Sequence, residues 1–336
     1  MIITELYAEQ GLGNQLWVYA ACRSIAEQLN YPFAVLGQRN FKGRQFLNLD
    51  FASSNVLGEA LASGGLSGSH GMPPTIFHER LFYDPDLRYI ASDFDESVMA
   101  LGAYTRLEGL FQSERYFFGD TSRTRSYIRI KDDWLASVSV SEDVCVLNVR
   151  GGEYKRHKRL ILPPTYWLNA MGNMKAMTGI DNFLIVTDDP RYAASLLPDI
   201  PVLQGGIAEC YIALHEAKNV IVSNSSFSYF PIKTGREDRV VIAPKHWARF
   251  GNRCSRWASP ANLYESWMWQ DVGGSLHSYA DCLPEQEQTS AYYRDSYYLC
   301  TVPSAVSNPG IRGHFPNWLK NPIKKGLSWF FPRHIG

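Results

Sequence analysis

The sequence has little cysteine and no spacing of it that would build a disulfide framework or a metal site. No Cys-x-x-Cys pair and no Cys/His spacing typical of zinc is present among six cysteines, at positions 22, 145, 210, 254, 282 and 300. Several of them fall inside apolar stretches, where a thiol behaves as a small hydrophobic group. This pattern is typical of a reduced protein, and we expect a cytoplasmic location.

The chain also lacks an excess of charge of either sign and any long apolar run. Lys plus Arg and Asp plus Glu both number 33, so no global field would draw in nucleic acid, and an anion site has to be local. No stretch approaches the roughly 20 apolar residues that a membrane span needs, and no basic segment followed by an apolar core begins the chain. We therefore expect neither secretion nor an integral membrane anchor.

A glycine turn near the N-terminus lacks the third glycine of a dinucleotide-binding fold. Apolar residues at 2–7 predict a strand, residues 11–15 read Gly-Leu-Gly-Asn-Gln, and apolar residues recur at helical spacing over 16–29. Glu27 falls inside this predicted helix, and no acidic residue follows the next predicted strand until Asp50, which argues against a dinucleotide oxidoreductase. Such a turn suits an anion, because glycine admits close approach and the helix N-terminus offers unpaired N–H groups. The alternative is a structural turn that only caps the helix.

Length and pattern predict two α/β domains. At 336 residues the chain exceeds one average domain, and we expect domains at 1–140 and 141–295 and a tail at 296–336. Buried strands alternating with helices predict a parallel, doubly wound sheet in the second domain, with strands at 144–149, 183–187, 219–222 and 240–243. In the first domain we expect a strand at 32–36, a Gly/Ser-rich surface loop at 58–71, and a strand running into a helix at 107–117.

Polar clusters in the second half follow the predicted strands directly. Arg150 comes after the first strand, Asp188 and Asp189 after the second, and the run 223–228 after the third. Loops that follow parallel strands converge in space although they lie far apart in sequence. The sequence therefore predicts one site built from these three loops.

Six stretches occur in the order of a known family. They are Gly11–Gln15 with its helix, Gly-Leu-Phe-Gln-Ser-Glu-Arg-Tyr-Phe at 109–117, Asn-Val-Arg-Gly-Gly-Glu-Tyr at 148–154, Thr-Asp-Asp at 187–189, Ser-Asn-Ser-Ser-Phe-Ser at 223–228 and Ala-Pro-Lys-His-Trp at 243–247. Together they resemble the glycosyltransferase family 11 fucosyltransferases, the galactoside α-1,2-fucosyltransferases. None of the stretches is specific alone, and the resemblance rests on their shared order.

The resemblance implies a GT-B-like fold, in which two Rossmann-like, doubly wound domains face each other across a cleft. It implies GDP-fucose as donor, inversion at the anomeric carbon, and no required metal or other cofactor. The first domain would hold the acceptor and the second the nucleotide-sugar donor. The arginine of the family's His-x-Arg-x-Gly-Asp motif, which contacts the donor diphosphate, corresponds here to Arg150. The chain departs from the motif at Asn148, where histidine is usual, and at Glu153, where aspartate is usual.

Sugar transfer places growing negative charge on the leaving diphosphate, and a planar guanidinium can hold two phosphate oxygens at once. We therefore assign Arg150 a catalytic role. Glu153 is the nearest carboxylate that could act as general base, although it could equally pair with Arg150 or with the basic residues at 155–159. Asp188 and Asp189 are the second choice for the base, or bind the ribose or the nucleobase.

The remaining predicted contacts follow from these motifs. Donor contacts are assigned to Gly11, Gly13, Asn14, Gln15, Arg150, Thr187, Asp188, Asp189, Ser223, Asn224, Ser225, Ser226, Phe227 and Ser228. The acceptor or the cleft is assigned Gln112, Ser113 and His157. Asp93-Phe-Asp95 matches a metal-binding pattern of other glycosyltransferases, but it lies in the wrong half of the chain to serve a donor at Arg150.

The tail has no acidic residue from 296 onward, and basic residues are interleaved with aromatic ones over 312–333. Such a segment suits the surface of an anionic membrane, where lipid-linked glycans would be found, or it packs on the N-terminal domain. The leading hypothesis is an inverting fucosyltransferase that acts on a galactoside in a surface polysaccharide or lipo-oligosaccharide precursor. The alternatives are a transferase with another GDP-sugar or another acceptor, protein O-fucosylation included, and an inactive nucleotide or carbohydrate binding module.

Overall fold

The computed structural model describes residues 1–52, 74–84, 86–87, 89–295 and 299–300. The predicted loop at 58–71 and the basic, aromatic segment at 312–333 lie outside the described residues, as does the membrane contact proposed for that segment. None of the helices among the described residues is long and apolar enough to cross a lipid bilayer.

The N-terminal sheet is parallel throughout and has the strand order β2-β1-β7-β4. Its strands are β1 (Ile2–Glu5), β2 (Phe33–Leu36), β4 (Thr75–His78) and β7 (Thr105–Glu108). Helix α1 (Leu12–Gln28) follows the glycine turn, as the sequence predicted, and packs on β1. The predicted strand at residue 107 begins earlier and ends at Glu108, and the helix after it is only a 3-10 turn, η3 (Glu114–Phe117).

A buried carboxylate explains the early end of β7. The backbone N–H groups of Leu110 and Phe111 donate to one oxygen of Glu79, at 2.6 and 2.9 Å, instead of to a neighbouring strand. The other oxygen accepts a hydrogen bond of 3.1 Å from the Tyr116 hydroxyl. Residues 109–111 therefore turn away from the sheet.

The C-terminal sheet has the order β10-β9-β11-β12-β13-β14, and only its last pair is antiparallel. Four of its strands were predicted and are confirmed: β9 (Val144–Val149), β10 (Asn182–Thr187), β11 (Asn219–Val222) and β12 (Val240–Pro244). The edge pair β13 (Met268–Gln270) and β14 (Leu276–His277) was not predicted.

Helices cover both faces of this sheet. Alternate residues of β9 separate into two cores: Leu147 packs with α5 (Pro164–Thr178), and Val146 packs with α7 (Ile207–Glu216) and α8 (Tyr229–Thr234). The short helix α6 (Pro190–Leu196) follows β10. A doubly wound α/β architecture with parallel sheets is thus confirmed.

Smaller elements complete the fold. A three-stranded sheet joins β5 (Leu81–Asp84), β6 (Tyr89–Ser92) and β15 (Leu299–Cys300), and β3 (Leu47–Leu49) pairs with β8 (Ile128–Ile130). The remaining helices are α3 (Arg123–Tyr127), α4 (Asp132–Leu135) and α9 (Tyr279–Asp295). Short 3-10 turns lie at η1 (Gln38–Asn40), η2 (Glu96–Ala100), η4 (Gly152–Arg156), η5 (Ser226–Ser228), η6 (Trp247–Arg249) and η7 (Pro260–Asn262).

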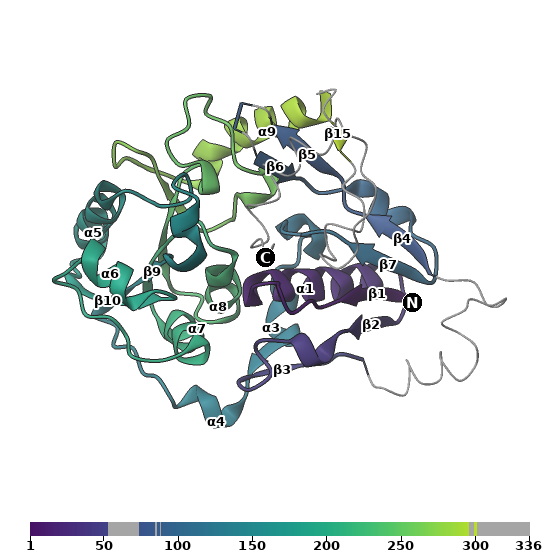
Figure 1. Cartoon of the computed structure of the whole chain (residues 1–336), viewed down its shortest axis with the longest axis horizontal. Helices are drawn as coiled ribbons and strands as arrows, with labels where there is room; N and C mark the ends of the chain where they lie inside the picture. The colour runs from purple at the N-terminus through teal and green to yellow at the C-terminus, as the bar shows by residue number, and fades with distance from the viewer. Residues whose placement is uncertain (53–73, 85, 88, 296–298, 301–336) are drawn as a thin grey trace, which may run out of the picture.

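The two halves of the molecule share one hydrophobic core. Helix α1 lies in the middle of the molecule beside α8 (Figure 1). Trp17 of α1 stacks on Tyr229 of α8, with ring centroids 4.2 Å apart, and meets Phe230 edge-on at 5.1 Å. All three side chains are fully buried. The sheets are therefore held together by packed aromatic rings.

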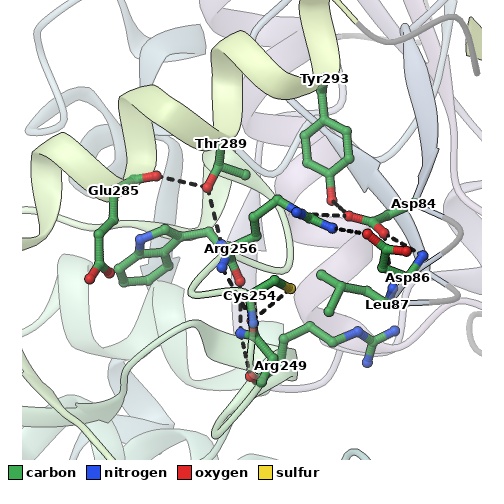
Figure 2. A network of polar contacts seen from close by, with 11 residues as sticks. Asp84, Asp86, Leu87, Arg249, Cys254, Arg256, Glu285, Thr289 and Tyr293 are labelled. Atoms are coloured by element: carbon green, nitrogen blue, oxygen red, sulfur yellow. Dashed lines mark hydrogen bonds and ion pairs between the residues drawn. The ribbon is translucent and has the colours of Figure 1, made fainter.

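Helix α9 adds a second connection, this one polar. Arg256 pairs with Asp84 of β5 at 3.0 Å and with Asp86 at 2.7 Å, and the Tyr293 hydroxyl of α9 donates to the same Asp84 at 3.1 Å. Figure 2 shows these groups converging on Asp84. A further hydrogen bond of 2.6 Å runs from Ser290 to Asp93. Helix α9 is thus bound to the hairpin of β5 and β6, which lies about 200 residues earlier in the chain.

Candidate functional site

A cavity of about 480 Å³ lies where the carboxyl ends of strands from both sheets meet. Its walls are the segments that follow β1, β2, β7, β9, β10, β11 and β12, together with the start of α7. We call it the interlobe cavity. It is lined by Glu9, Gly11, Leu12, Gly13, Asn14, Lys42, Gln112, Asn148, Val149, Arg150, Glu153, Tyr154, Leu160, Thr187, Asp188, Pro190, Gly205, Gly206, Ile207, Cys210, Asn224, Ser225, Ser226, Phe227, Trp247 and Ala248.

Arg150 stands immediately after β9 and is held between two carboxylates. Its Nη1 lies 2.9 Å from Oδ2 of Asp188 and its Nη2 lies 3.2 Å from Oε1 of Glu153. The guanidinium carbon is 5.3 Å from the ring centroid of Tyr154, and a quarter of the side chain is exposed. Its Nε is buried and has no hydrogen-bond partner among the described residues. The fork is therefore oriented at the cavity wall and keeps further N–H donors for an anion.

The backbone after Arg150 is fitted to Asp188. The Gly151 N–H donates to Oδ1 of Asp188 at 2.9 Å. Gly152 has a φ of +30°, and a Cβ there would come within 2.1 Å of Asp188 Oδ2. Glycine is required at 152 on both counts, because the backbone is strained for other residues and the carboxylate occupies the space. Asp188 thus fixes both the Arg150 side chain and the loop that carries it.

Asp189 turns away from the cavity. Its carboxylate accepts from Tyr192 N at 3.1 Å, which caps α6, and forms an ion pair with Lys155. The Lys155 ammonium and that cap hold the pKa of Asp189 below its usual value. Thr187 lines the cavity, and its hydroxyl accepts a hydrogen bond of 3.0 Å from Asp189 N. Of the three residues, the structure brings Thr187 and Asp188 to the site.

The serine run, residues 223–228 after β11, also contains both residues that line the cavity and residues that do not. Its four middle residues line the cavity, whereas Ser223 and Ser228 lie behind it. The Ser223 hydroxyl donates to Asn148 at 3.3 Å, and the Ser228 hydroxyl donates to the carbonyl of Ser225 at 2.9 Å. Ser225 in turn caps η5. The two outer serines therefore support the loop from inside the protein.

The glycine turn forms the facing wall. Nothing lies within 4 Å of where a Cβ on Gly11 would be, so this glycine faces open space. A Cβ on Gly13 would lie 2.4 Å from the backbone of Ser226, so this glycine is needed for close packing of α1 on η5. The Asn14 side-chain oxygen accepts hydrogen bonds from the Ser226 hydroxyl at 2.7 Å and from the Gln112 amide at 2.9 Å.

Gln15 does not reach the cavity. Its side chain is fully buried, and its amide donates to the carbonyls of Tyr7 and Asn40 at 3.0 and 2.8 Å. Its oxygen accepts from the backbone N–H of Lys42 at 3.0 Å. Gln15 thus anchors the loops after β1 and β2 to the start of α1.

Of the three predicted acceptor residues, one lines the cavity and two do not. Gln112 lines the cavity. Ser113 is buried and caps η3 with its hydroxyl, and His157 lies at the end of η4, outside the cavity wall.

Sequence reasoning missed Glu9, Lys42 and Trp247 as site residues. All three line the cavity. Lys42 is exposed at the cavity wall, and partial desolvation there lowers the pKa of its ammonium, although Glu153 and Glu9 oppose the shift and Arg150 adds to it. The signal that could have found Lys42 is its position in the first loop after the predicted strand at 32–36. Ligand sites form at the carboxyl ends of parallel strands, and Lys42 follows such a strand in the first domain.

No group of three or more His, Cys, Asp or Glu side chains that could hold a metal ion occurs among the described residues. The Asp93-Phe-Asp95 stretch is engaged elsewhere: Asp93 accepts from Ser290 at 2.6 Å, and Asp95 accepts from Ser97 N at 3.1 Å, capping η2.

No family model and no curated protein matches the chain in sequence. Several solved structures have a similar chain path. A fucosyltransferase, NodZ from Bradyrhizobium, is 14% identical, with 68% of this chain and 91% of that chain covered and a TM-score of 0.42. The E. coli heptosyltransferase WaaC with ADP is 10% identical, with 86% and 100% covered and a TM-score of 0.40. POFUT1 in complex with GDP is 8% identical, with 72% and 97% covered and a TM-score of 0.40.

Proposed function

We propose that this chain is an inverting glycosyltransferase that moves fucose from GDP-fucose to a hydroxyl group of a glycan acceptor. The observation that carries the proposal is the position of Arg150 in the interlobe cavity, where Asp188 and Glu153 hold its fork and the open backbone at Gly11 lines the same cavity. The cavity volume of about 480 Å³ falls within the range of small-molecule sites.

The chemistry asked of Arg150 is stabilisation of the leaving group. The bond between the anomeric carbon and the diphosphate oxygen breaks, and its electron pair goes to GDP. The acceptor oxygen bonds to the anomeric carbon from the opposite face and gives up its proton. Fixed cationic donors at the departing oxygen lower the barrier, because the charge there grows in the transition state. Lys42 places a second cation on the facing wall.

Glu153 is the proposed general base. It lines the cavity, and half of its side chain is exposed, so an acceptor hydroxyl can reach it. Asp188 suits a positioning role better, because its two oxygens hold Gly151 N and Arg150. Asp189 is committed to α6 and Lys155. Glu9 is another exposed carboxylate that lines the cavity.

Thr187, Phe227 and the turn at 205–207 form the part of the cavity that we assign to the nucleotide. An aromatic face can stack on a purine, and backbone groups can bind its edge. The Gly206 N–H at the start of α7 is already satisfied by Glu209 at 2.8 Å, so this helix end is capped by the chain itself.

The test measures GDP binding first and then GDP release from GDP-fucose, with and without β-galactosides. Transfer with an inverted anomeric product, read by NMR, supports the proposal. A second GDP-hexose in the same assay tests the alternative donor, and an acceptor peptide tests protein O-fucosylation. A chain that binds GDP tightly but neither hydrolyses nor transfers the sugar is a binding module, the alternative that Asn148 and Glu153 motivate.

A further inference from the structure

Every residue from 155 to 159 is basic, in the order Lys, Arg, His, Lys, Arg. This run stands out in a chain whose formal net charge is zero. It begins five residues after Arg150, so the fold places it beside the proposed reaction site.

The run forms a rim of the interlobe cavity. Glu153 and Tyr154 before it and Leu160 after it line the cavity, whereas none of residues 155–159 does. Asn224 fixes both ends: its carbonyl accepts from the Tyr154 hydroxyl at 3.2 Å, and its side-chain amide donates to the carbonyl of Leu160 at 3.2 Å. The basic rim, residues 155–159, is therefore anchored to the cavity wall at its start and its end.

The positive charge of the rim is only partly neutralised. Lys155 pairs with Asp189, and Arg159 donates to the carbonyl of Leu87 at 3.3 Å. Arg156 and Lys158 are exposed, and within the described part of the chain no carboxylate lies within 4 Å of either. Arg156, Lys158 and Arg159 thus leave uncompensated charge at the mouth of the cavity.

The donor does not account for this charge. Within the cavity, the diphosphate of a nucleotide sugar would meet Arg150 and Lys42, which line its walls. The rim lies outside these walls, so an anion bound there belongs to a molecule that extends out of the cavity. In a sugar transfer, that molecule is the acceptor.

We propose that the basic rim binds a negatively charged group of the acceptor, so that the enzyme acts on an acidic glycan. This inference rests on the proposed sugar transfer. The shared chemistry is an anionic oxygen group, which a uronic acid carboxylate or a glycosyl phosphate would supply. Arg156 offers a planar fork to either group, and Lys158 a point charge.

The test compares wild type with Arg156→Gln/Lys158→Gln. The control, Lys175→Gln/Arg294→Gln, removes the same charge from exposed positions on α5 and α9. Three acceptor probes of equal length are used: a glucuronate-containing oligosaccharide, a glycosyl phosphate and a neutral β-galactoside. Their affinities for the GDP complex are measured by calorimetry, and KM values for donor and acceptor by GDP release.

We expect wild type to bind at least one acidic probe more tightly than the neutral one, with an advantage that falls as salt is added. The rim variant should weaken binding of that probe roughly three- to tenfold, as for two exposed ion pairs, with donor KM unchanged. The control should match wild type. The preferred acidic probe distinguishes carboxylate from phosphate.

Equal affinity of wild type for charged and neutral probes would overturn the proposal. It would also be overturned if the rim variant had a higher KM for the donor and an unchanged KM for the acceptor. The proposal would also be overturned if the rim variant lost binding to anionic phosphatidylglycerol vesicles but bound the soluble acceptors as wild type does. The rim would then bind a membrane surface. Failure of the proposed function looks different: wild type would then not bind GDP or release it from GDP-fucose.

Discussion

The side-chain oxygen of Asn14 accepts a hydrogen bond of 2.7 Å from the hydroxyl of Ser226, a residue 212 positions later in the chain. Next to it, the Cα of Gly13 faces the Ser226 backbone so closely that a Cβ would lie 2.4 Å away. These contacts set the spacing between the glycine turn and the serine run, which form adjoining walls of the interlobe cavity. The geometry of the site therefore depends on small residues that join its two sides.

Gly13→Ala and Gly11→Ala form a matched pair. At 13 the new methyl group meets backbone that cannot move aside, so we expect a loss of stability of about 1–3 kcal/mol and weaker GDP binding. At 11 the φ of −67° suits alanine and the space is open, so stability should stay near wild type. Chemical denaturation and GDP titration measure both. Equal stability of the two variants would contradict the close packing assigned to Gly13.

Arg150→Lys should lower turnover at least tenfold, because an ammonium cannot reproduce a planar fork on two phosphate oxygens. The lysine also cannot bridge Asp188 and Glu153 in the same way. Turnover is measured at saturating donor and acceptor. Arg236→Lys, at an exposed ion pair with Glu142 and Asp238, serves as the control and should keep the wild-type rate. A wild-type rate for Arg150→Lys would remove this residue from the mechanism.

Glu153→Gln tests the general base. We expect turnover at saturating acceptor to fall by about 10²-fold or more, since the amide cannot accept the hydroxyl proton, while GDP binding persists. The amide can still contact Arg150 through its oxygen, so the fork should stay in place. If turnover does not change, Glu9 and Asp188 become the carboxylates to test next.

Chelation should leave the reaction unchanged. The resemblance implies no required metal, and Asp93 and Asp95 are engaged by Ser290 and Ser97. We expect equal turnover after dialysis against EDTA and after addition of Mg²⁺ or Mn²⁺. Loss of activity on chelation that Mn²⁺ restores would show that the proposed metal independence is wrong.

Glu79 should make stability depend on pH. Burial raises the pKa of this carboxyl to about 7, although Leu110, Phe111 and Tyr116 donate to it. The folded state therefore binds the proton more tightly than the unfolded state, whose pKa is near 4.5. This contribution, on the order of 3 kcal/mol, is present below pH 4.5 and is lost as the pH rises through 7.

The measurement for Glu79 is the free energy of unfolding at pH 5 and pH 8, in wild type and in Glu79→Gln. Other titrating groups are common to both proteins, so the difference between the two curves isolates this residue. The variant should lose less stability than wild type on going from pH 5 to pH 8. Parallel curves would mean that Glu79 titrates alike in the folded and unfolded chains.

The sequence was most informative where a buried strand ends in polar residues. The strand ahead of Arg150 was predicted from its β-branched run, and its parallel neighbours predicted that Thr187, Asp188 and Ser225 would meet it. The direction in which each side chain points was harder to predict. Asp189 and Gln15 belong to the same motifs, yet their side chains turn away from the cavity because their partners, Lys155 and Asn40, are set by tertiary contacts.

Lys42 and Glu9 belong to no motif, because each is a lone charged residue in a loop, and only the position of Lys42 after a predicted strand pointed to the site. The approach of Lys42 to Arg150 and Glu153 depends on how α1 packs against η5, which no local pattern encodes. The end of β7 at Glu108 was unpredictable for a similar reason. It depends on the carboxylate of Glu79, in the loop after β4, and a fully buried glutamate is too rare to be expected from sequence.

The stacking of Trp17 on Tyr229 limits how this molecule can move. A hinge motion that opened the angle between the two sheets would separate these rings and expose them to water, together with Phe230. Such exposure costs several kcal/mol for large aromatic side chains. In the proposed sugar transfer, nucleotide exchange would therefore use the existing opening, with rearrangements confined to loops at its edge, rather than a wide hinge motion in every catalytic cycle.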